Sequence, residues 1–159
     1  MIVTPMQMAL MTAAVANGGK LLKPRLVVEL EDQRTTRRLE TMPDAQVERQ
    51  IPLDQRGLNL TRAAMLADVE ENGGSGKESY IPGMGICGKT GTAQVEKNGG
   101  IDHITWFVSY APYQNPKYAV VVLVESGVSG GLSCAPKAKE IYKTIQRIEN
   151  DRLKKMAEQ

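Results

Sequence analysis

Apolar and polar positions in the first half of the chain predict two helices separated by a polar stretch. Thr4 can cap a helix and Pro5 suits its first turn, and the run Met6–Asn17 is rich in helix formers up to a Gly-Gly stop. This first helix is apolar on most sides, so we expect it to be buried on most sides. Residues 31–55 are polar and mixed in charge, which indicates an exposed excursion. A second helix is predicted over residues 58–71, and the side chains available for packing there are Leu58, Ala64, Met65 and Val69.

The second half of the chain has the pattern of strands. We expect a strand over Lys89–Val95. Residues 104–110 alternate between apolar and polar, which predicts a half-buried strand. Residues 118–124 are almost continuously apolar, which suits a strand buried on both faces. Only residues 112–117 separate these two strands. That is too short for a parallel crossover, so the pair is predicted to be an antiparallel hairpin.

A final helix is predicted to begin near Pro136, capped by Ser133 or Ala135. Its apolar stripe consists of Ala138, Ile141, Tyr142, Ile145 and Ile148. Its charged end, residues 151–159, is expected to fray. The predicted fold class is therefore α+β, with a three-stranded antiparallel sheet packed by helices in one unit over residues 1–150.

Composition excludes several classes of protein. The 159 residues are 42% hydrophobic and 24% charged, which fits one folded domain rather than a disordered chain. The balance of 20 basic and 18 acidic groups is too even for a nucleic-acid-binding surface. Two cysteines and one histidine leave little for a zinc site, so we expect no metal and no cofactor. The sequence shows neither a signal peptide nor an apolar run long enough to span a membrane.

One motif has two interpretations. Gly83–Thr90 matches G-x-x-x-x-G-K-[ST], the pattern of a phosphate-binding P-loop. A P-loop needs a hydrophobic strand before it and a helix after it. Residues 78–82 make a poor strand, and Asn98-Gly99-Gly100 interrupts any helix soon after the motif. A nucleotide-binding module therefore stays as an alternative only, together with a non-catalytic domain that binds a partner protein.

The second interpretation uses residues 88–94, Gly-Lys-Thr-Gly-Thr-Ala-Gln. With its flanks, this segment resembles the third active-site motif of class B penicillin-binding proteins, and it is most similar to their elongation-type members, penicillin-binding protein 2. The resemblance covers nearly the whole chain apart from about residues 31–55. The flanking segments that continue it are Val3–Ala9, Ala16–Gly19, Asp102-His103, Trp106–Tyr113, Asn115–Lys117, Val120–Glu125, Gly130-Gly131 and Ala135-Pro136.

The resemblance implies part of the fold shared by serine β-lactamases and penicillin-binding transpeptidases, and it implies a role for each residue of the motif. Lys89 would supply a positive charge to the terminal carboxylate of the substrate and take part in proton transfer. The Thr90 and Thr92 hydroxyls would bind that carboxylate, and the Thr92 backbone N–H would form half of an oxyanion hole. Gly91 would let the ligand lie against the strand. His103 is expected to be structural, and Trp106 and Phe107 to be core residues on opposite faces.

Two motifs of the family are absent from this sequence. No serine has a lysine three residues later, and no Ser-x-Asn occurs. The chain therefore resembles the C-terminal half of a transpeptidase domain, and alone it should be inactive. The complete enzyme would be a peptidoglycan D,D-transpeptidase that takes stem peptides as substrates and is trapped by β-lactams. By resemblance, it would be held at the bacterial inner membrane by an anchor outside this chain. It would work on the periplasmic side beside a SEDS glycosyltransferase.

The strand over residues 118–124 would normally lie beside a strand from the missing half. Without that neighbour it becomes an edge of apolar residues with neither Pro nor charge, a combination that favours pairing with another chain. We therefore expect either self-association through this edge or its coverage by the extended stretch Leu21–Leu30. We also expect Cys87 and Cys134 to be unpaired, because the strand order places them far apart.

Overall fold

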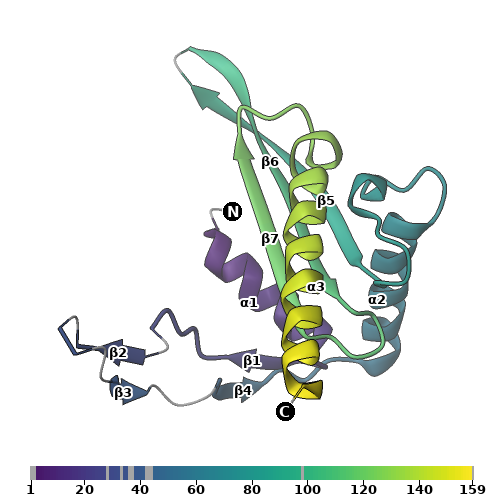
Figure 1. Ribbon diagram of the computed structural model, residues 1–159. Coiled ribbons are helices and arrows are strands. Elements are labelled where there is room, and N and C mark those ends of the chain that lie inside the picture. The colour runs from purple at the N-terminus through teal and green to yellow at the C-terminus, as the bar shows by residue number, and fades with distance from the viewer. Residues whose placement is uncertain are drawn as a thin grey trace.

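The computed structural model describes residues 3–27, 29–32, 34–35, 38–41, 45–97 and 99–158. It has the predicted α+β fold, a three-stranded antiparallel sheet between helices (Figure 1). The elements, in chain order, are α1 (Pro5–Ala16), β1 (Lys20–Leu22), β2 (Glu29–Glu31), β3 (Arg38–Thr41), β4 (Val47–Gln50), α2 (Gln55–Glu70), the 3₁₀ turn η1 (Lys77–Ser79), β5 (Cys87–Lys97), β6 (Gly100–Ala111), β7 (Tyr118–Glu125), the π-helical turn η2 (Gly130–Cys134) and α3 (Ala135–Ala157).

The sheet has the order β5-β6-β7, and both pairings are antiparallel. The hairpin between β6 and β7 is thus confirmed. β6 is the central strand and is buried on both faces over residues 107–111, so the prediction of a half-buried strand is wrong there. β7 was predicted to be buried on both faces, and it is less buried than that. Val120 is its one buried residue, because β7 has a single neighbour in the described part of the chain.

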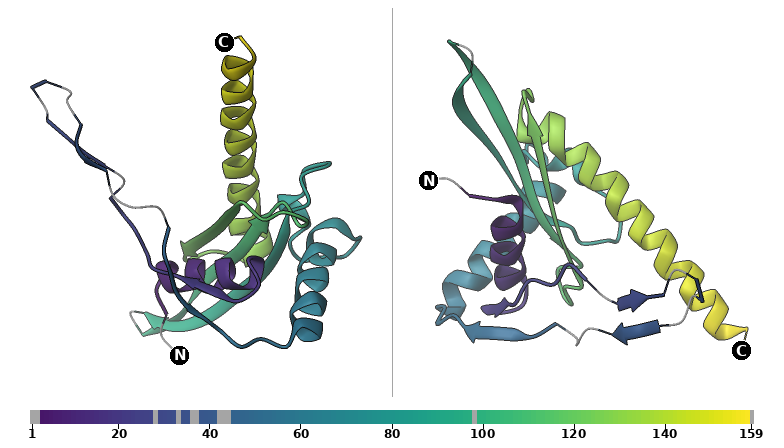
Figure 2. Two further views of the ribbon diagram at one scale, coloured as in Figure 1. Left: turned by 90° about the horizontal axis from the view of Figure 1, so that it is seen from below. Right: turned by 90° about the vertical axis from the view of Figure 1, so that its left-hand side faces the viewer.

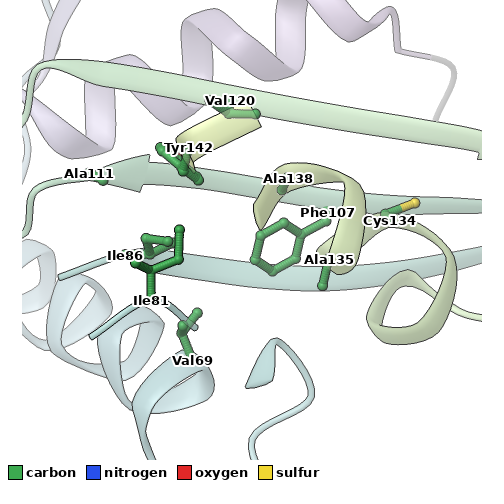
Figure 3. Close-up of a cluster of buried hydrophobic side chains, with 10 residues drawn as sticks. All are labelled: Val69, Ile81, Ile86, Phe107, Ala111, Val120, Cys134, Ala135, Ala138 and Tyr142. Carbon is green, nitrogen blue, oxygen red and sulfur yellow. The ribbon is translucent and has the colours of Figure 1, made fainter. Parts of the chain in front are cut away.

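Two helices cover opposite faces of the sheet. α1 packs on β6 and β7 from one side, and α3 packs on the same strands from the other (Figure 2). The larger core cluster lies on the α3 side and includes the fully buried side chains of Phe107, Tyr142 and Val69 (Figure 3). Phe107 is therefore a core residue, as predicted, whereas Trp106 on the other face is only half-buried.

α1 begins as its sequence predicts. Thr4 is the N-cap, and its side chain forms a reciprocal capping box with Gln7. Its burial differs from the expectation, because only three residues of α1 are buried, and all three are small: Thr12, Ala14 and Ala16. Met6 and Met11 are 41% and 46% exposed, so this apolar helix is open on one side. Met11, together with Met8 and Val15, lines the groove described below.

α2 is capped by Asp54, whose carboxylate accepts hydrogen bonds from the N–H groups of Arg56 and Gly57. Three of its four predicted packing residues, Leu58, Met65 and Val69, are buried. The fourth, Ala64, is exposed and faces the groove beside α1. Its position on the helix, one residue from Met65, turns it away from the core.

α3 follows η2 directly. Its N-cap residue is Cys134, with no side-chain cap, so neither Ser133 nor Ala135 holds the capping position. The helix runs on to Ala157 through most of the charged segment that was expected to fray. Ala138 and Tyr142 of the predicted stripe are buried, whereas Ile141 and Ile148 are more than 40% exposed. The second half of α3 extends beyond the sheet (Figure 2).

The polar segment between α1 and α2 forms an arm that leaves the sheet (Figure 2). β1 pairs with β4 at its base, and β2 pairs with β3 further out. All four residues of β4 are exposed. Because the stretch Leu21–Leu30 runs into this arm, it does not cover β7, and that alternative for the free edge is wrong.

Candidate active site

The predicted site residues lie together in the middle of β5. Lys89 is paired with Val108, Gly91 with Trp106, and Thr92 with Thr105. β5 has β6 on one side only in the described residues, so the motif lies on a free edge. Successive side chains of a strand point to opposite faces. Lys89 therefore faces the α1 side, while the hydroxyls of Thr90 and Thr92 share the opposite face.

A largely apolar groove of about 870 Å³ lies along the Lys89 face. α1, α2 and the two strands β5 and β6 form its walls. Three methionines take part in the lining; the apolar lining residues include Met8, Met11, Val15, Leu60, Ala64, Met65, Trp106 and Val108. The groove is thus an open apolar surface that reaches Lys89, the single cationic residue of the motif.

The space over Gly91 is open on this face. A Cβ built on Gly91 would meet only the Trp106 side chain, at an ordinary contact distance of 3.6 Å. Packing among the described residues therefore does not demand glycine here. The expected reason for Gly91, the close approach of a ligand, stays a prediction.

A smaller hollow of about 430 Å³ lies on the other side of the edge. Thr90 and Thr92 line it, together with the loop after α2 and the residues of η2. Thr90, Gly91 and Thr92 thus border both the polar hollow and the apolar groove. A ligand at this edge could meet both.

Four side chains form a hydrogen-bonded cluster between α2 and β5. Ser75 Oγ lies 2.6 Å from Thr90 Oγ1 and 2.9 Å from a carboxylate oxygen of Asp68. Lys89 Nζ lies 3.4 Å from Ser75 Oγ and 3.4 Å from Thr90 Oγ1. The motif is therefore connected to the C-terminal end of α2 through Ser75.

The loop after α2 is shaped to make this contact. The Ser75 N–H donates to Asp68 Oδ1 at 3.0 Å, and the Gly76 N–H donates to the Asp68 carbonyl at 3.1 Å. A Cβ on Gly74 would overlap the backbone of Asp68, so the close approach of the loop requires glycine there. No sequence motif pointed to a role for Asp68 or Ser75. The available signal was the Asn-Gly-Gly-Ser-Gly turn between a helix and the motif strand.

A second contact fixes α2 against the sheet. The Arg62 guanidinium donates to the Tyr110 hydroxyl at 3.2 Å and to the Tyr113 carbonyl at 2.7 Å. It also lies over both rings, 5.8 and 5.5 Å from their centroids. Cys87 packs beside Tyr110, and burial raises the pKa of its thiol to about 11. Cys87 and Cys134 are both free thiols, as expected.

The structure contradicts the alternative that residues 83–90 form a nucleotide-binding P-loop. Gly88, Lys89 and Thr90 lie inside the long strand β5, and β6 follows that strand directly. A P-loop instead wraps around phosphate between a strand and the N-terminus of a helix. In the part of the chain that the structure describes, no three potential metal ligands come together. None of the described helices has the length and apolar character of a membrane span.

His103 lies on β6 opposite Gln94, half-buried and outside the hydrogen-bonded cluster. Its backbone N–H donates to the side chain of Asp102 at 2.8 Å. The structural role expected for His103 stays a prediction.

Comparison with known families decides the origin of this arrangement. The model for the penicillin-binding protein transpeptidase domain matches residues 1–143. The chain belongs to this family. Its fold, with the Lys-Thr-Gly strand β5 at one edge of the sheet, is that of the transpeptidase domain. The recognition of the class B penicillin-binding proteins from the sequence is confirmed.

Curated relatives are similar over most of this chain. It is 31% identical to the peptidoglycan D,D-transpeptidase MrdA of Haemophilus influenzae over 91% of the chain and 24% of the relative. It is 34% identical to the peptidoglycan D,D-transpeptidase PbpA of Mycolicibacterium smegmatis over 84% of the chain and 27% of the relative. The chain thus spans about a quarter of the length of these relatives.

Solved structures agree with this assignment. The D,D-transpeptidase domain of a peptidoglycan glycosyltransferase from Eggerthella lenta is 29% identical and superposes with a TM-score of 0.72, over 92% of this chain and 33% of that one. Penicillin-binding protein A of M. tuberculosis, as its imipenem acyl-enzyme complex, is 28% identical with a TM-score of 0.69, over 90% and 31%. That relative forms a covalent complex with a β-lactam.

Proposed function

We propose that this chain is the substrate- and penicillin-binding half of a peptidoglycan D,D-transpeptidase. The observation that carries the proposal is the free edge of β5, where the Lys89 amine lies 3.4 Å from the Thr90 hydroxyl and the Thr92 hydroxyl lies on the same face as that of Thr90. A cation and two hydroxyls at a strand edge suit a peptide that ends in a carboxylate and binds as an added strand.

The reaction is acyl transfer. A serine oxygen attacks the carbonyl carbon of the penultimate D-alanine of a stem peptide, the peptide bond to the terminal D-alanine breaks, and the leaving amine takes a proton. An amine of a neighbouring stem peptide then attacks the acyl-serine ester and releases the serine. A β-lactam reacts in the same way as the stem peptide in the first step. The serine attacks the carbonyl carbon of the lactam ring, the ring opens, and a stable acyl-enzyme remains.

Each residue of the motif has a part in this reaction. Lys89 attracts the terminal carboxylate and assists proton transfer near the attacking serine. Thr90 and Thr92 donate hydrogen bonds to the carboxylate. The Thr92 N–H helps to stabilise the oxyanion, a contribution of about 2.7–4 kcal/mol for one such donor in other enzymes.

The attacking serine belongs to another part of the complete enzyme, because this sequence has no Ser-x-x-Lys. The apolar groove between α1, α2 and β5 is suited to pack against that part. We place the complete enzyme at the inner membrane, where it acts outside the cytoplasm beside a SEDS glycosyltransferase. Both features follow from the family resemblance.

Labelling with a fluorescent penicillin tests the proposal. The complete transpeptidase, made of this chain and the half that carries Ser-x-x-Lys, should form one acyl adduct, detected by intact mass. The isolated chain should form none, because Lys89 and two threonines cannot replace an activated serine. A complete, folded domain that forms no adduct would favour a non-catalytic partner-binding module instead.

A further inference from the structure

Ser75 contacts two residues of the motif, Lys89 and Thr90, through its hydroxyl. It comes from the loop after α2, seven residues beyond Asp68, and its hydroxyl reaches the hydroxyl of Thr90 at 2.6 Å. Its oxygen also lies 3.4 Å from Lys89 Nζ. Two of the proposed carboxylate-binding groups therefore share one neighbour outside the motif.

The donors in this cluster can be counted. Asp68, when ionised, only accepts hydrogen bonds, and it lies 2.9 and 3.2 Å from Ser75 Oγ. Ser75 thus donates its proton to Asp68 and has lone pairs left for Thr90 and Lys89. Asp68 keeps the Ser75 backbone N–H as a second donor at 3.0 Å. The Ser75 hydroxyl can therefore turn away from Asp68 without leaving that carboxylate unpaired.

This freedom matters when a carboxylate arrives at β5. Thr90 must then point its proton at the ligand, and its oxygen becomes free to accept a hydrogen bond. Ser75 can supply that bond by turning its own proton to Thr90 Oγ1, which leaves a chain of donors from Ser75 through Thr90 to the ligand. Hydrogen bonds in such a chain strengthen one another.

We propose that Ser75 is a positioning residue for carboxylate recognition, which fixes the Thr90 hydroxyl and the Lys89 amine from the end of α2. The inference rests on the proposed function and adds a residue outside the Lys-Thr-Gly motif. Ser75 is not proposed as a nucleophile. The lysine nearest to it in sequence, Lys77, donates instead to the Glu70 carbonyl at 2.6 Å.

The experiment compares two ligands on the complete transpeptidase. Benzylpenicillin carries the carboxylate, whereas its methyl ester has the same reactive ring without the charge. Ser75→Ala should lower the second-order acylation rate for benzylpenicillin about tenfold, the value of one modest hydrogen bond. The rate for the methyl ester should stay within about twofold of the unaltered protein, because the ester presents no carboxylate to the cluster.

Matched variants separate positioning from loop folding. Ser79→Ala removes a buried hydroxyl of the same loop, which donates to the Gly76 carbonyl at 2.8 Å and does not contact the motif. It should leave the preference for benzylpenicillin over the ester unchanged. Ser75→Thr keeps the hydroxyl and should restore most of that preference. Ser75→Ala combined with Thr90→Val should lose less than the sum of the two single losses, because Ser75 acts partly through Thr90; fully additive losses would contradict that coupling.

The outcomes distinguish a failure of the proposed transpeptidase function from a failure of the proposed role of Ser75. If the unaltered complete enzyme is not acylated, the proposed function is wrong. If it is acylated but Ser75→Ala changes neither rate, or lowers both rates equally, the positioning role of Ser75 is wrong. Should Ser75→Ala fail to fold, Ser75→Cys decides in the same assay, because its thiol has similar size and is a weak hydrogen-bonding group.

Discussion

Tyr142 of α3 donates a hydrogen bond to the hydroxyl of Ser109 in β6, with 3.1 Å between the two oxygens. Ser109 in turn donates to the carbonyl of Val120 in β7 at 3.0 Å. Tyr142 and Ser109 are fully buried. One chain of hydrogen bonds therefore links the C-terminal helix to the two strands beneath it, on the far side of the sheet from the Lys89 groove.

Replacing Tyr142 by Phe should destabilise the folded protein by about 1–3 kcal/mol, because Ser109 loses its buried donor. Chemical denaturation measures the change as a lower free energy of unfolding. Tyr118→Phe is the matched control, since the Tyr118 hydroxyl donates to Glu149 at 2.9 Å at a partly exposed site. An equal decrease in the free energy of unfolding in the two variants would show that the buried hydrogen bonds stabilise the fold no more than the partly exposed one does.

The buried thiol of Cys87 predicts a pH dependence of stability. Burial raises its pKa from 9.0 to about 11, so the folded state keeps the thiol neutral where the unfolded chain has lost the proton. Stability from this group is complete below about pH 9 and falls as the pH rises toward 11. Burial also raises the pKa of Tyr110, which acts in the same direction at higher pH.

A Cys87→Ala variant isolates the contribution of the thiol. Unfolding free energies measured at pH 8 and pH 10 should fall less steeply in the variant than in the unaltered protein. Identical slopes would mean that the Cys87 thiol titrates with its ordinary pKa in the folded state.

The elements could be predicted from the sequence where local chemistry decides them. Thr4 and Pro5 mark the start of α1 unaided, and the short link between β6 and β7 allows only a hairpin. The burial of each strand was harder to predict from the sequence, because it depends on neighbours far away in the chain. An alternating pattern in β6 suggested one buried face, yet α1 and α3 cover both. A continuous apolar pattern in β7 suggested two buried faces, yet the strand lies at an edge.

The candidate site was predictable only in part, for a similar reason. The face shared by Thr90 and Thr92 follows from the period of two along a strand. The contact between Ser75 and Thr90 spans fifteen residues and depends on how tightly the loop turns at Gly74 against α2. The pattern of apolar and polar residues along the sequence does not indicate such a contact. Ser75 has no lysine three residues later, and nothing in the local sequence places its hydroxyl beside the motif.

Lys89→Ala in the complete transpeptidase should lower the rate of acylation by benzylpenicillin about 10- to 150-fold with the fold kept. This range corresponds to the loss of one hydrogen bond to a charged group. Stopped-flow acylation kinetics measure it, and thermal unfolding checks the fold. Lys117→Ala is the control, because Lys117 is an exposed partner of Glu149 on α3. An unchanged rate for Lys89→Ala would overturn the assignment of the carboxylate site.

The free edge of β7 gives the last prediction. Its residues 120–124 are apolar and carry no proline or charge, and β6 is its single strand partner in the described residues. Alternate amides of an edge strand point away from its neighbour and stay unpaired. In the isolated chain we therefore expect self-association through β7, because the arm that contains β1 and β2 does not cover it.

Hydrogen exchange of the isolated chain decides this point. Either the amides of Val120, Val122 and Val124 or those of the residues between them face away from β6. That outward set should become protected as the protein concentration rises, while the inward set is protected throughout. Ala119→Lys adds a charge at an exposed position of β7 and should shift the chain toward a monomer, since edge lysines oppose strand pairing. Fast exchange of the outward amides in a strictly monomeric sample, unchanged by concentration, would rule out pairing through this edge.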